Sequence, residues 1–493
     1  ASAQPAQDEA AIPPAINSTT RDPAQDAMIE RALDATVSLD SERQPLAKFV
    51  TIPELQKLRV VIEVKALDEA GIGLDTAVDC HVSQITLRSA LSLALTPLTL
   101  TYLVKDGLLS ITTWEQASSL TMTQTYQVDD LVRSDRADTG SPNYSALATL
   151  MTSTVQPATW DEVGGPGTMR FFQGALVIDQ TYGLHRDIAH TLAALRECRS
   201  QNQRGDREAV WAESPAQRAV RRRFEQSASL QGDFDFREVT LSAAVAAIGE
   251  RFKLQLMLDR AALEEAGIGD DTPVTMTLRS VSPPIALDRV LRPLELTCVI
   301  HDEVGLVTTV ERDSTMLSVV IHPVDDLVHA GAADKGQPHG FGRLMDVITS
   351  TTRPNTWDEV GGPGTISPFS VASCLAIGQT GDAQTEIARL MAALRTCRTP
   401  AAAAAEISSS AAEQRPRADV VTRLYRLPTD TDHSAIAEAI REMDAGNWEE
   451  KGFRLRISGN SLVVRQTRRM QQQIDEFLNR KPAAAGGVGS GMF

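Results

Sequence analysis

Residues 66–78 read ALDEAGIGLDTAV, and residues 262–274 read ALEEAGIGDDTPV, which is nearly the same sequence at an offset of 262 − 66 = 196 positions. Further along, TWDEVGGPGT at 159–168 recurs at 356–365. The similarity between the two copies extends over most of the intervening sequence. A repeat of this length indicates tandem copies of a folded unit, so most of the chain is duplicated.

A third, partial copy near the C-terminus contains only the second half of the repeat. Trp448 stands where Trp160 and Trp357 stand, and residues 462–467 (LVVRQT) match residues 176–181 (LVIDQT). Because this half recurs alone, we divide the repeat into two modules, X and Y. The chain then has the order X-Y-X-Y-Y.

Module X has the pattern of a small α+β domain. In its second copy Leu241, Val245 and Ile248 are spaced as on one face of a helix, with Thr240 as a suitable N-cap. We expect this helix to be followed by a strand at 254–258, a strand at 274–278, a helix at 285–291 and a final hairpin of LTCVI and GLVTTV. Two helices would then pack on a sheet.

Module Y is expected to have the order β-α-β-β-α. Its first copy predicts a strand over 123–132, a helix over 144–152, two strands joined at Gly174, and a closing helix with Leu184 and Ile188 on its apolar face. The predicted fold class of the whole chain is therefore α+β, as a multidomain tandem repeat. The expected segments are a flexible extension (1–30), X1 (31–120), Y1 (121–200), a basic, partly helical linker (201–228), X2 (229–316), Y2 (317–399), an Ala/Ser linker (400–418), Y3 (419–481) and a flexible tail (482–493).

Composition excludes several classes of function. The chain has 493 residues, a formal charge of −16, 42% hydrophobic residues and only 4% aromatic residues. Acidic charge opposes binding to a phosphate backbone, and few aromatic residues are present for base stacking, so we expect no nucleic-acid partner. No run of 18 apolar residues occurs, so no transmembrane segment is expected.

The N-terminal sequence ASAQPAQDEAAIPPAINSTTRDPAQ is rich in small residues, Gln and Pro. It resembles the start of an exported protein whose signal peptide has been removed, and an ordinary disordered cytosolic terminus is the alternative. Five cysteines in a chain of this length do not indicate a disulfide framework. Cys198 and Cys397 occupy equivalent positions after the closing helices, where in an oxidising compartment they could cross-link modules or neighbouring molecules, or remain semi-buried thiols.

The glycines of GGPG, at 164–167 and 361–364, do not match a phosphate-binding loop, because no Lys follows and a strand rather than a helix comes next. They favour a tight turn with positive φ. His185 and His190 are five residues apart, which places them on different faces of a helix and disfavours a zinc site.

The acidic pairs Asp129-Asp130 and Asp325-Asp326 are adjacent along an expected strand, so their carboxylates should point to opposite faces. We interpret them as strand-ending and helix-capping residues. The recurring Trp160, Trp357 and Trp448 are expected in the core of each Y module rather than at an interface. The run Arg221-Arg222-Arg223 is read as a solvated helix face, with a docking site as the alternative. The sequence predicts no catalytic, cofactor-binding or metal-binding residue, no cofactor and no enzyme activity.

With these motifs in view, module X resembles the short N-terminal domain (STN) shared by secretins and TonB-dependent transducers, through residues 236–248, 254–259 and 274–278. Module Y resembles the KH-like ring-building domains at the N-terminus of secretins. Together with AGIGxDTPV and WDEVGGPGT, the set is similar to repeat-bearing envelope proteins of planctomycete-type bacteria. Unlike true secretins, the chain contains no Gly-rich pore-forming region of β-strands after the modules.

This resemblance implies a non-enzymatic structural protein of the cell envelope, periplasmic or associated with the outer membrane. The resemblance implies a homo-oligomeric ring or scaffold, alone or as part of a secretin-like pore complex, since head-to-tail contacts between small domains close into rings. The alternative is an accessory module that docks a separate secretin, transporter or pilus component. The expected partners are copies of itself and other envelope proteins, with no small-molecule substrate.

Overall fold

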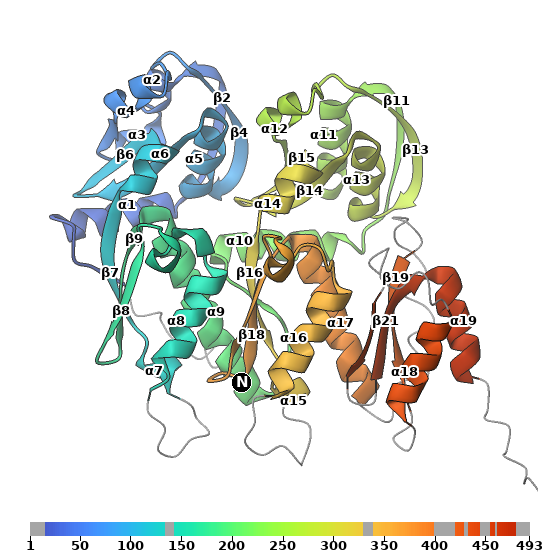
Figure 1. The fold of residues 1–493 in the computed structure, drawn as a ribbon. Coiled ribbons are helices and arrows are strands. Elements are labelled where there is room, and N and C mark those ends of the chain that lie inside the picture. Colours follow the sequence, from blue (N-terminus) through green and yellow to red (C-terminus); the bar gives the residue numbers. More distant parts are fainter. Residues whose placement is uncertain are drawn as a thin grey trace, which may run out of the picture. The chain divides into compact units, whose positions relative to one another are not determined.

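The computed structural model describes residues 15–133, 142–328, 339–398, 420–427, 432–443, 454–458 and 461–479. Contacts within the chain define two compact units, Ala1–Pro323 with Pro363–Gly381, and Val324–Gly362 with Asp382–Phe493. Both units combine helices with small sheets, which confirms the expected multidomain α+β class (Figure 1). Among the described residues, no helix is long and apolar enough to cross a membrane.

Both X modules lie in the first unit and share one topology. Each has a pair of antiparallel strands and a separate three-stranded sheet whose first strand runs parallel to its middle strand. The elements of X1 are β2 (Thr36–Pro45), α2 (Leu46–Phe49), α3 (Pro53–Gln56), β3 (Val60–Ile62), α4 (Val64–Glu69), β4 (Ala77–Thr86), α5 (Leu87–Leu95), β5 (Leu100–Lys105), β6 (Leu108–Thr113) and α6 (Trp114–Ser119). Those of X2 are β11 (Gly232–Thr240), α11 (Leu241–Phe252), β12 (Leu256–Leu258), α12 (Arg260–Glu265), β13 (Pro273–Val281), α13 (Pro283–Leu291), β14 (Leu296–His301), β15 (Val304–Thr309) and α14 (Val310–Thr315).

The two main helices and the final hairpin of module X are confirmed. Thr240 caps α11 as expected, because its side chain accepts a hydrogen bond from the backbone N–H of Ala243 at 3.2 Å. The expectation of one sheet is wrong, since β11 and β13 form a sheet of their own. β-Bulges interrupt the register of this strand pair, for example between Phe236 and Val239, and a bulge bends the strand that carries it.

The repeated AGIG motif ends a short helix in both X modules. Gly71 and Gly267 have φ values of 72° and 71°, in the left-handed region where glycine carries no steric penalty. The backbone N–H of Ile72 then bonds to the carbonyl of Leu67 at 2.9 Å, and Ile268 bonds to Leu263 at 2.8 Å in the same way. This turn directs each isoleucine back against its own module's core.

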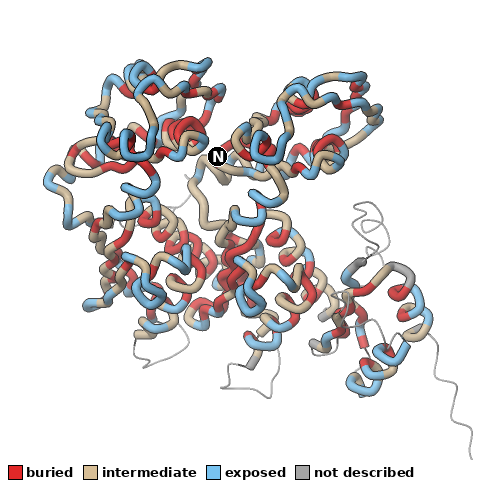
Figure 2. The backbone as a smooth tube through the Cα atoms, turned by 45° about the horizontal axis from the view of Figure 1, so that its top comes forward, coloured by how far each residue is buried: buried red, intermediate tan, exposed pale blue. Residues whose placement is uncertain are grey.

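Y1 has the expected β-α-β-β-α order with one addition. Its strand does not run on to residue 132, because the chain turns into the short helix α7 (Asp129–Val132), so Asp129 and Asp130 lie on a helix and not on a strand. The remaining elements are β7 (Thr121–Gln127), α8 (Tyr144–Thr154), β8 (Thr168–Phe172), β9 (Ala175–Thr181) and α9 (Tyr182–Arg204). Figure 2 shows the buried positions along these strands and helices.

The expected flexible extension is wrong for residues 15–30, while residues 1–14 lie outside the described residues. β1 (Ile16–Asn17) pairs with β7, and α1 (Pro23–Leu33) buries Ile29 and Leu33 completely. The basic linker repeats this arrangement. Its β10 (Val210–Trp211) pairs with β16 (Ser318–Pro323), and α10 (Pro215–Ser227) confirms the expected partial helix. Each repeat therefore begins with a short strand and a helix that tie it to a Y sheet.

The strands of Y2 belong to the first unit and most of its helical residues belong to the second. Its sheet has the order β10-β16-β18-β17, with β17 (Thr365–Phe369) and β18 (Cys374–Gln379). The second unit contains α15 (Asp325–Val328), α16 (His339–Thr351) and α17 (Gly381–Arg398), followed by Y3 with β19 (Val420–Arg426), α18 (His433–Glu442), β20 (Arg454–Ser458), β21 (Ser461–Thr467) and α19 (Arg468–Asn479). The module boundaries given above stay predictions.

The tryptophan and glycines that recur in the two repeats form one loop, the tryptophan loop, which is present in both Y1 and Y2. Trp160 and Trp357 are each 1% exposed, and each indole N–H donates to a backbone carbonyl, of Val155 at 2.9 Å and of Thr352 at 2.8 Å. Core packing of these two tryptophans is confirmed, while Trp448 lies outside the described residues. The predicted turn with positive φ is also confirmed, at 89° in Gly164 and 85° in Gly361.

We predict that two adjacent glycines of this loop differ in their tolerance of a methyl group. A Cβ on Gly164 would meet open space, so Gly164→Ala should lower the free energy of unfolding by about 1 kcal/mol through its positive φ alone. A Cβ on Gly165 would lie 2.2 Å from the carbonyl carbon of Thr159, so Gly165→Ala should lower it by about 3 kcal/mol. Urea unfolding of both variants measures the difference, and equal losses would contradict this account of the loop.

Candidate functional site

His185 is a structural residue of the Y1 core. Its Nδ1 lies 2.9 Å from the Tyr126 hydroxyl and its Nε2 lies 2.6 Å from the Met122 carbonyl oxygen, so both ring nitrogens are occupied. Burial lowers the pKa of His185 to about 4, although the bond to Met122 acts in the opposite direction. In Y3 the same position holds Gln471, whose side-chain oxygen accepts from the Tyr425 hydroxyl at 2.6 Å. The glutamine therefore binds the hydroxyl of the equivalent tyrosine as the histidine does.

The paired aspartates hold the closing helices in place. Asp129 binds Arg133 at 2.9 Å, whereas Asp130 accepts from Arg196 of α9 at 2.7 Å. In the second unit Asp326 binds Arg395 of α17 in the equivalent way, at 3.0 Å. The predicted strand end is confirmed, since β7 ends at Gln127, whereas the predicted capping role is wrong for α7. Neither side chain caps this helix, and Asp130 instead binds a helix far along the chain.

A buried glutamine that the sequence analysis did not single out recurs in all three Y modules. Gln180, Gln379 and Gln466 are fully buried, and the side-chain oxygen of each accepts from the N–H of the next residue, at 2.8, 2.9 and 2.8 Å. The side-chain nitrogen of Gln180 also donates to the carbonyl and hydroxyl of Thr159, which directly precedes Trp160. The Gln-Thr that ends each central strand was the sequence signal for this role.

The feature most relevant to function is the way Y1 packs on the next sheet. α8 packs against β17 and α9 packs against β16, so these Y1 helices share a core with the strands of Y2 (Figure 1). Ile321, Phe369 and Ala376 belong to this shared core and are fully buried. In addition, the Asn202 side chain donates to the carbonyl of Ala372 at 2.6 Å. The helices of one Y module thus cover the outer sheet face of the next.

The same contact occurs again in the second unit. There α16 packs against β20 and β21 of Y3, and the Arg465 side chain donates to the Thr351 carbonyl at 3.0 Å. The Y2 sheet has Gly378 at the position equivalent to Arg465. A Cβ added at Gly378 would lie 3.5 Å from the carbonyl oxygen of Thr154, which is the counterpart of Thr351. Corresponding atoms meet at both junctions, so one type of contact is used twice.

The outer face of the Y1 sheet has no such cover among the described residues of this chain. Strand register relates its residues to the covered face of Y2 one by one. Ile16, Val177, Ala175 and Phe172 of Y1 correspond to Val210, Ala376, Cys374 and Phe369 of Y2. Phe172 is 67% exposed where Phe369 is fully buried, and Ile16 is 63% exposed where Val210 is 6% exposed. Apolar residues therefore occupy the same four positions on an uncovered face.

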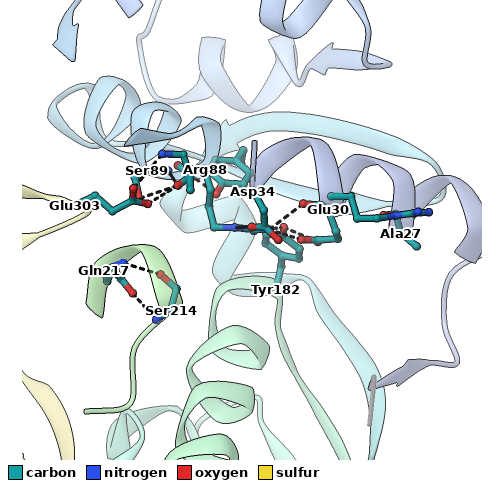
Figure 3. Close-up of polar contacts among 12 residues, drawn as sticks. Ala27, Glu30, Asp34, Arg88, Ser89, Tyr182, Ser214, Gln217 and Glu303 are labelled. Atoms are coloured by element: carbon teal, nitrogen blue, oxygen red, sulfur yellow. Dashed lines mark hydrogen bonds and ion pairs between the residues drawn. The ribbon is translucent and has the colours of Figure 1, made fainter. Parts of the chain in front are cut away.

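A second set of contacts joins the X modules to each other and to Y1 (Figure 3). Glu303, in the β14–β15 turn of X2, is 5% exposed and accepts from the Thr86 N–H at 3.1 Å and the Ser89 hydroxyl at 2.8 Å, at the start of α5 in X1. Its carboxylate therefore satisfies the N-terminus of a helix in another module, which fixes X2 against X1.

At the junction of X1 with Y1, the Tyr182 hydroxyl donates to Glu30 at 2.7 Å and accepts from Arg88 at 3.2 Å (Figure 3). Arg88 also binds Glu30 at 2.7 Å and Asp34 at 2.9 Å. Burial, and then the Glu30 carboxylate, raise the pKa of Tyr182 well above its usual value. The tyrosine therefore stays protonated and acts as a hydrogen-bonding anchor between the modules.

One arginine of the basic run Arg221-Arg222-Arg223 forms ion pairs within the fold. Arg221 binds Glu213 at 2.7 Å and Glu225 at 2.6 Å, and its guanidinium lies 4.9 Å from the ring centre of Trp211. Arg222 and Arg223 are exposed, as a solvated helix face requires. Across the described ranges, no group of three or more His, Cys, Asp and Glu side chains is arranged to hold a metal ion.

Comparison with known proteins gives neighbours only among solved structures. No protein-family model and no curated protein matches the chain. The N-terminal domain of the secretin XcpQ from Pseudomonas aeruginosa aligns at 10% identity and a TM-score of 0.13, over 50% of this chain and 100% of its own. Aeromonas hydrophila ExeD aligns at 6% identity and a TM-score of 0.12, over 73% of this chain and 40% of its own. Secretin domains are thus among the structural neighbours, at scores too low to carry an argument.

We predict that His185→Gln makes the free energy of unfolding less dependent on pH between pH 6.5 and pH 4. The pKa of His185 is about 4 in the folded chain, against 6.5 for an unperturbed histidine. Between pH 4 and pH 6.5 this histidine is therefore protonated in the unfolded chain and neutral in the folded chain. Unfolding free energy should therefore fall as pH drops from 6.5 to 4, by about 3 kcal/mol. Glutamine keeps the hydrogen bond to Tyr126 and removes this loss.

Urea unfolding of the natural protein and the variant at pH 7 and pH 4.5 measures the effect. His190, whose pKa is also lowered to about 4, first by burial and then by Arg186, is present in both proteins, so its contribution cancels. Parallel stability profiles for the two proteins would show that His185 does not carry the dependence.

Proposed function

We propose that this protein is a non-enzymatic structural protein of the cell envelope that self-associates head to tail through its Y modules. The single observation that carries the proposal is the helix-on-sheet contact, which the chain makes once in each unit with corresponding residues. Contacts of this heterologous kind add further copies until they close into a ring or extend as a filament.

The uncovered face of the Y1 sheet is the place where a further copy would bind. Its four apolar positions match those that are buried in Y2, and Phe172 and Ile16 are both more than half exposed. Burial of apolar surface lowers the free energy by about 25 cal/mol per Å². A monomer leaves these side chains in water. Its Y1 sheet face is therefore available for a helix-on-sheet contact of the type that the chain already forms between its own modules.

The occupant that we propose is the helix pair α18 and α19 from Y3 of a second copy. α8 and α9 are covered by the next sheet, and α16 is covered by β20 and β21, whereas α18 and α19 have no following sheet within the described residues. A stack that continued from Y3 of one copy to Y1 of the next would repeat the contact found within the chain.

A second candidate function is an accessory module that binds a different envelope protein. It is favoured by the polar outer side of α18, where Glu438, Arg441 and Glu442 are exposed. A polar face of this kind is typical of the module that ends a stack. The Y1 face would then bind the helices of a separate secretin, transporter or pilus component. Location in the periplasm or at the outer membrane is proposed on the resemblance of the X and Y modules to secretin N-terminal domains.

We predict that Phe172→Glu abolishes self-association. The carboxylate would be buried unpaired in the contact, so the association constant should fall at least tenfold. Sedimentation velocity over a series of micromolar protein concentrations, together with native mass spectrometry, gives the distribution of oligomers. The matched control is Val163→Glu, because Val163 is 66% exposed on the same module but lies in the tryptophan loop, outside the sheet face.

Oligomers of the natural protein that persist in the control and disappear in Phe172→Glu would support the proposal. A natural protein that stays monomeric over the whole range would overturn self-association. Recovery of a separate channel protein from envelope extract by the natural protein, and its loss with Phe172→Glu, would then establish the accessory function.

A further inference from the structure

We propose that Cys198 and Cys374 form a disulfide bond that locks the helices of Y1 onto the sheet of Y2 when the protein meets a small-molecule disulfide such as oxidised glutathione. This inference concerns a contact inside the chain. It therefore stands independently of the proposed self-association.

The two thiols come from distant parts of the sequence and meet at the Y1–Y2 contact. Cys198 lies near the end of α9 and Cys374 is the first residue of β18, and both are completely buried in the same hydrophobic core. Burial and then the neighbouring Cys198 thiol raise the pKa of Cys374, so the two thiols lie next to each other. One helical turn beyond Cys198, Asn202 donates to the carbonyl of Ala372 at 2.6 Å, which holds the two segments together at this point.

The second junction supports this placement. Cys397 is the counterpart of Cys198 at the end of its closing helix, and Ser461 is the counterpart of Cys374 at the start of the central strand. Burial raises the pKa of the Cys397 thiol, and the nearby Arg426 and Ser461 act in the opposite direction, which places Ser461 next to this thiol. The same two positions therefore meet at both junctions, with two cysteines at one and a cysteine and a serine at the other. The sequence singles out Cys198 and Cys397 as cysteines that could cross-link modules or neighbours, and the structure places Cys374 next to the first and Ser461 next to the second.

The chemistry requires one oxidant and balances as a thiol–disulfide exchange. The thiolate of one cysteine attacks oxidised glutathione and releases one reduced glutathione, leaving a mixed disulfide. The second thiolate then attacks this mixed disulfide and releases the second glutathione. Overall two protein thiols lose two protons and two electrons, and one glutathione disulfide becomes two thiols.

Burial sets the conditions for the exchange. It raises the pKa of Cys374, and the neighbouring Cys198 thiol raises it further, so little thiolate is present in the closed structure. We therefore expect the bond to form during folding in the presence of oxidant, or when the Y1–Y2 contact opens transiently. Once formed, it closes a long loop and resists unfolding.

The test uses the natural full-length chain refolded with and without a mixture of oxidised and reduced glutathione. Peptide mapping by mass spectrometry without reduction should find a Cys198–Cys374 cross-linked peptide in the oxidised sample. The midpoint of thermal unfolding should rise by about 5 °C relative to the reduced sample. The rise should vanish in Cys374→Ser and persist in Cys80→Ser, which changes another buried cysteine in X1.

A second variant tests the geometry by adding a bond. Ser461→Cys should give a cross-linked peptide of Cys397 with residue 461 under the same conditions, because these positions correspond to Cys198 and Cys374. Two free thiols at 198 and 374 after oxidative refolding, or a Cys198–Cys397 peptide, would overturn the proposal. Both outcomes are read from the natural protein, so a variant that fails to fold cannot obscure the result.

Discussion

The packing of α8 and α9 on the sheet β10-β16-β18-β17 is the contact on which the rest of the first unit depends. A lone module of this size has one apolar sheet face for its own helices and leaves the other face in water. Here every residue of β18 is buried, whereas β9 of Y1 alternates between buried and half-buried positions. The difference arises because helices of the preceding module cover the outer face of β18. The chain thus gains core between its modules as well as within them.

The junctions are made specific by a few polar groups at their edges. Asn202, Arg465 and Glu303 each bind backbone groups of another module, at 2.6 Å, 3.0 Å and 3.1 Å. A backbone carbonyl or N–H stays in place when the sequence changes, so these bonds fix the register of one module on the next. Apolar burial supplies most of the free energy, and the polar bonds decide where the modules meet.

Much of the fold followed from sequence pattern. Helical spacing around Leu241, the β-α-β-β-α order of module Y and the turn at Gly164 could all be predicted because they depend on local geometry. The N-terminal segment could not, since β1 has two residues and exists only through its pairing with β7. Likewise, the split of module X into two sheets depends on bulges such as that between Phe236 and Val239, which the alternation of residues does not reveal.

By itself, the sequence determined that this protein is a duplicated α+β chain whose Y half occurs three times, because offset and periodicity are properties of the chain. Tertiary structure alone decided which residues meet between modules. Cys198 and Cys374 are 374 − 198 = 176 positions apart, and their contact follows from the packing of a helix on a sheet of a different module. It also decided that Phe172 is exposed while Phe369 is buried. The two phenylalanines occupy equivalent positions in similar strands, and their exposure differs because the Y1 helices cover the Y2 sheet, whereas among the described residues no helices cover the outer face of the Y1 sheet.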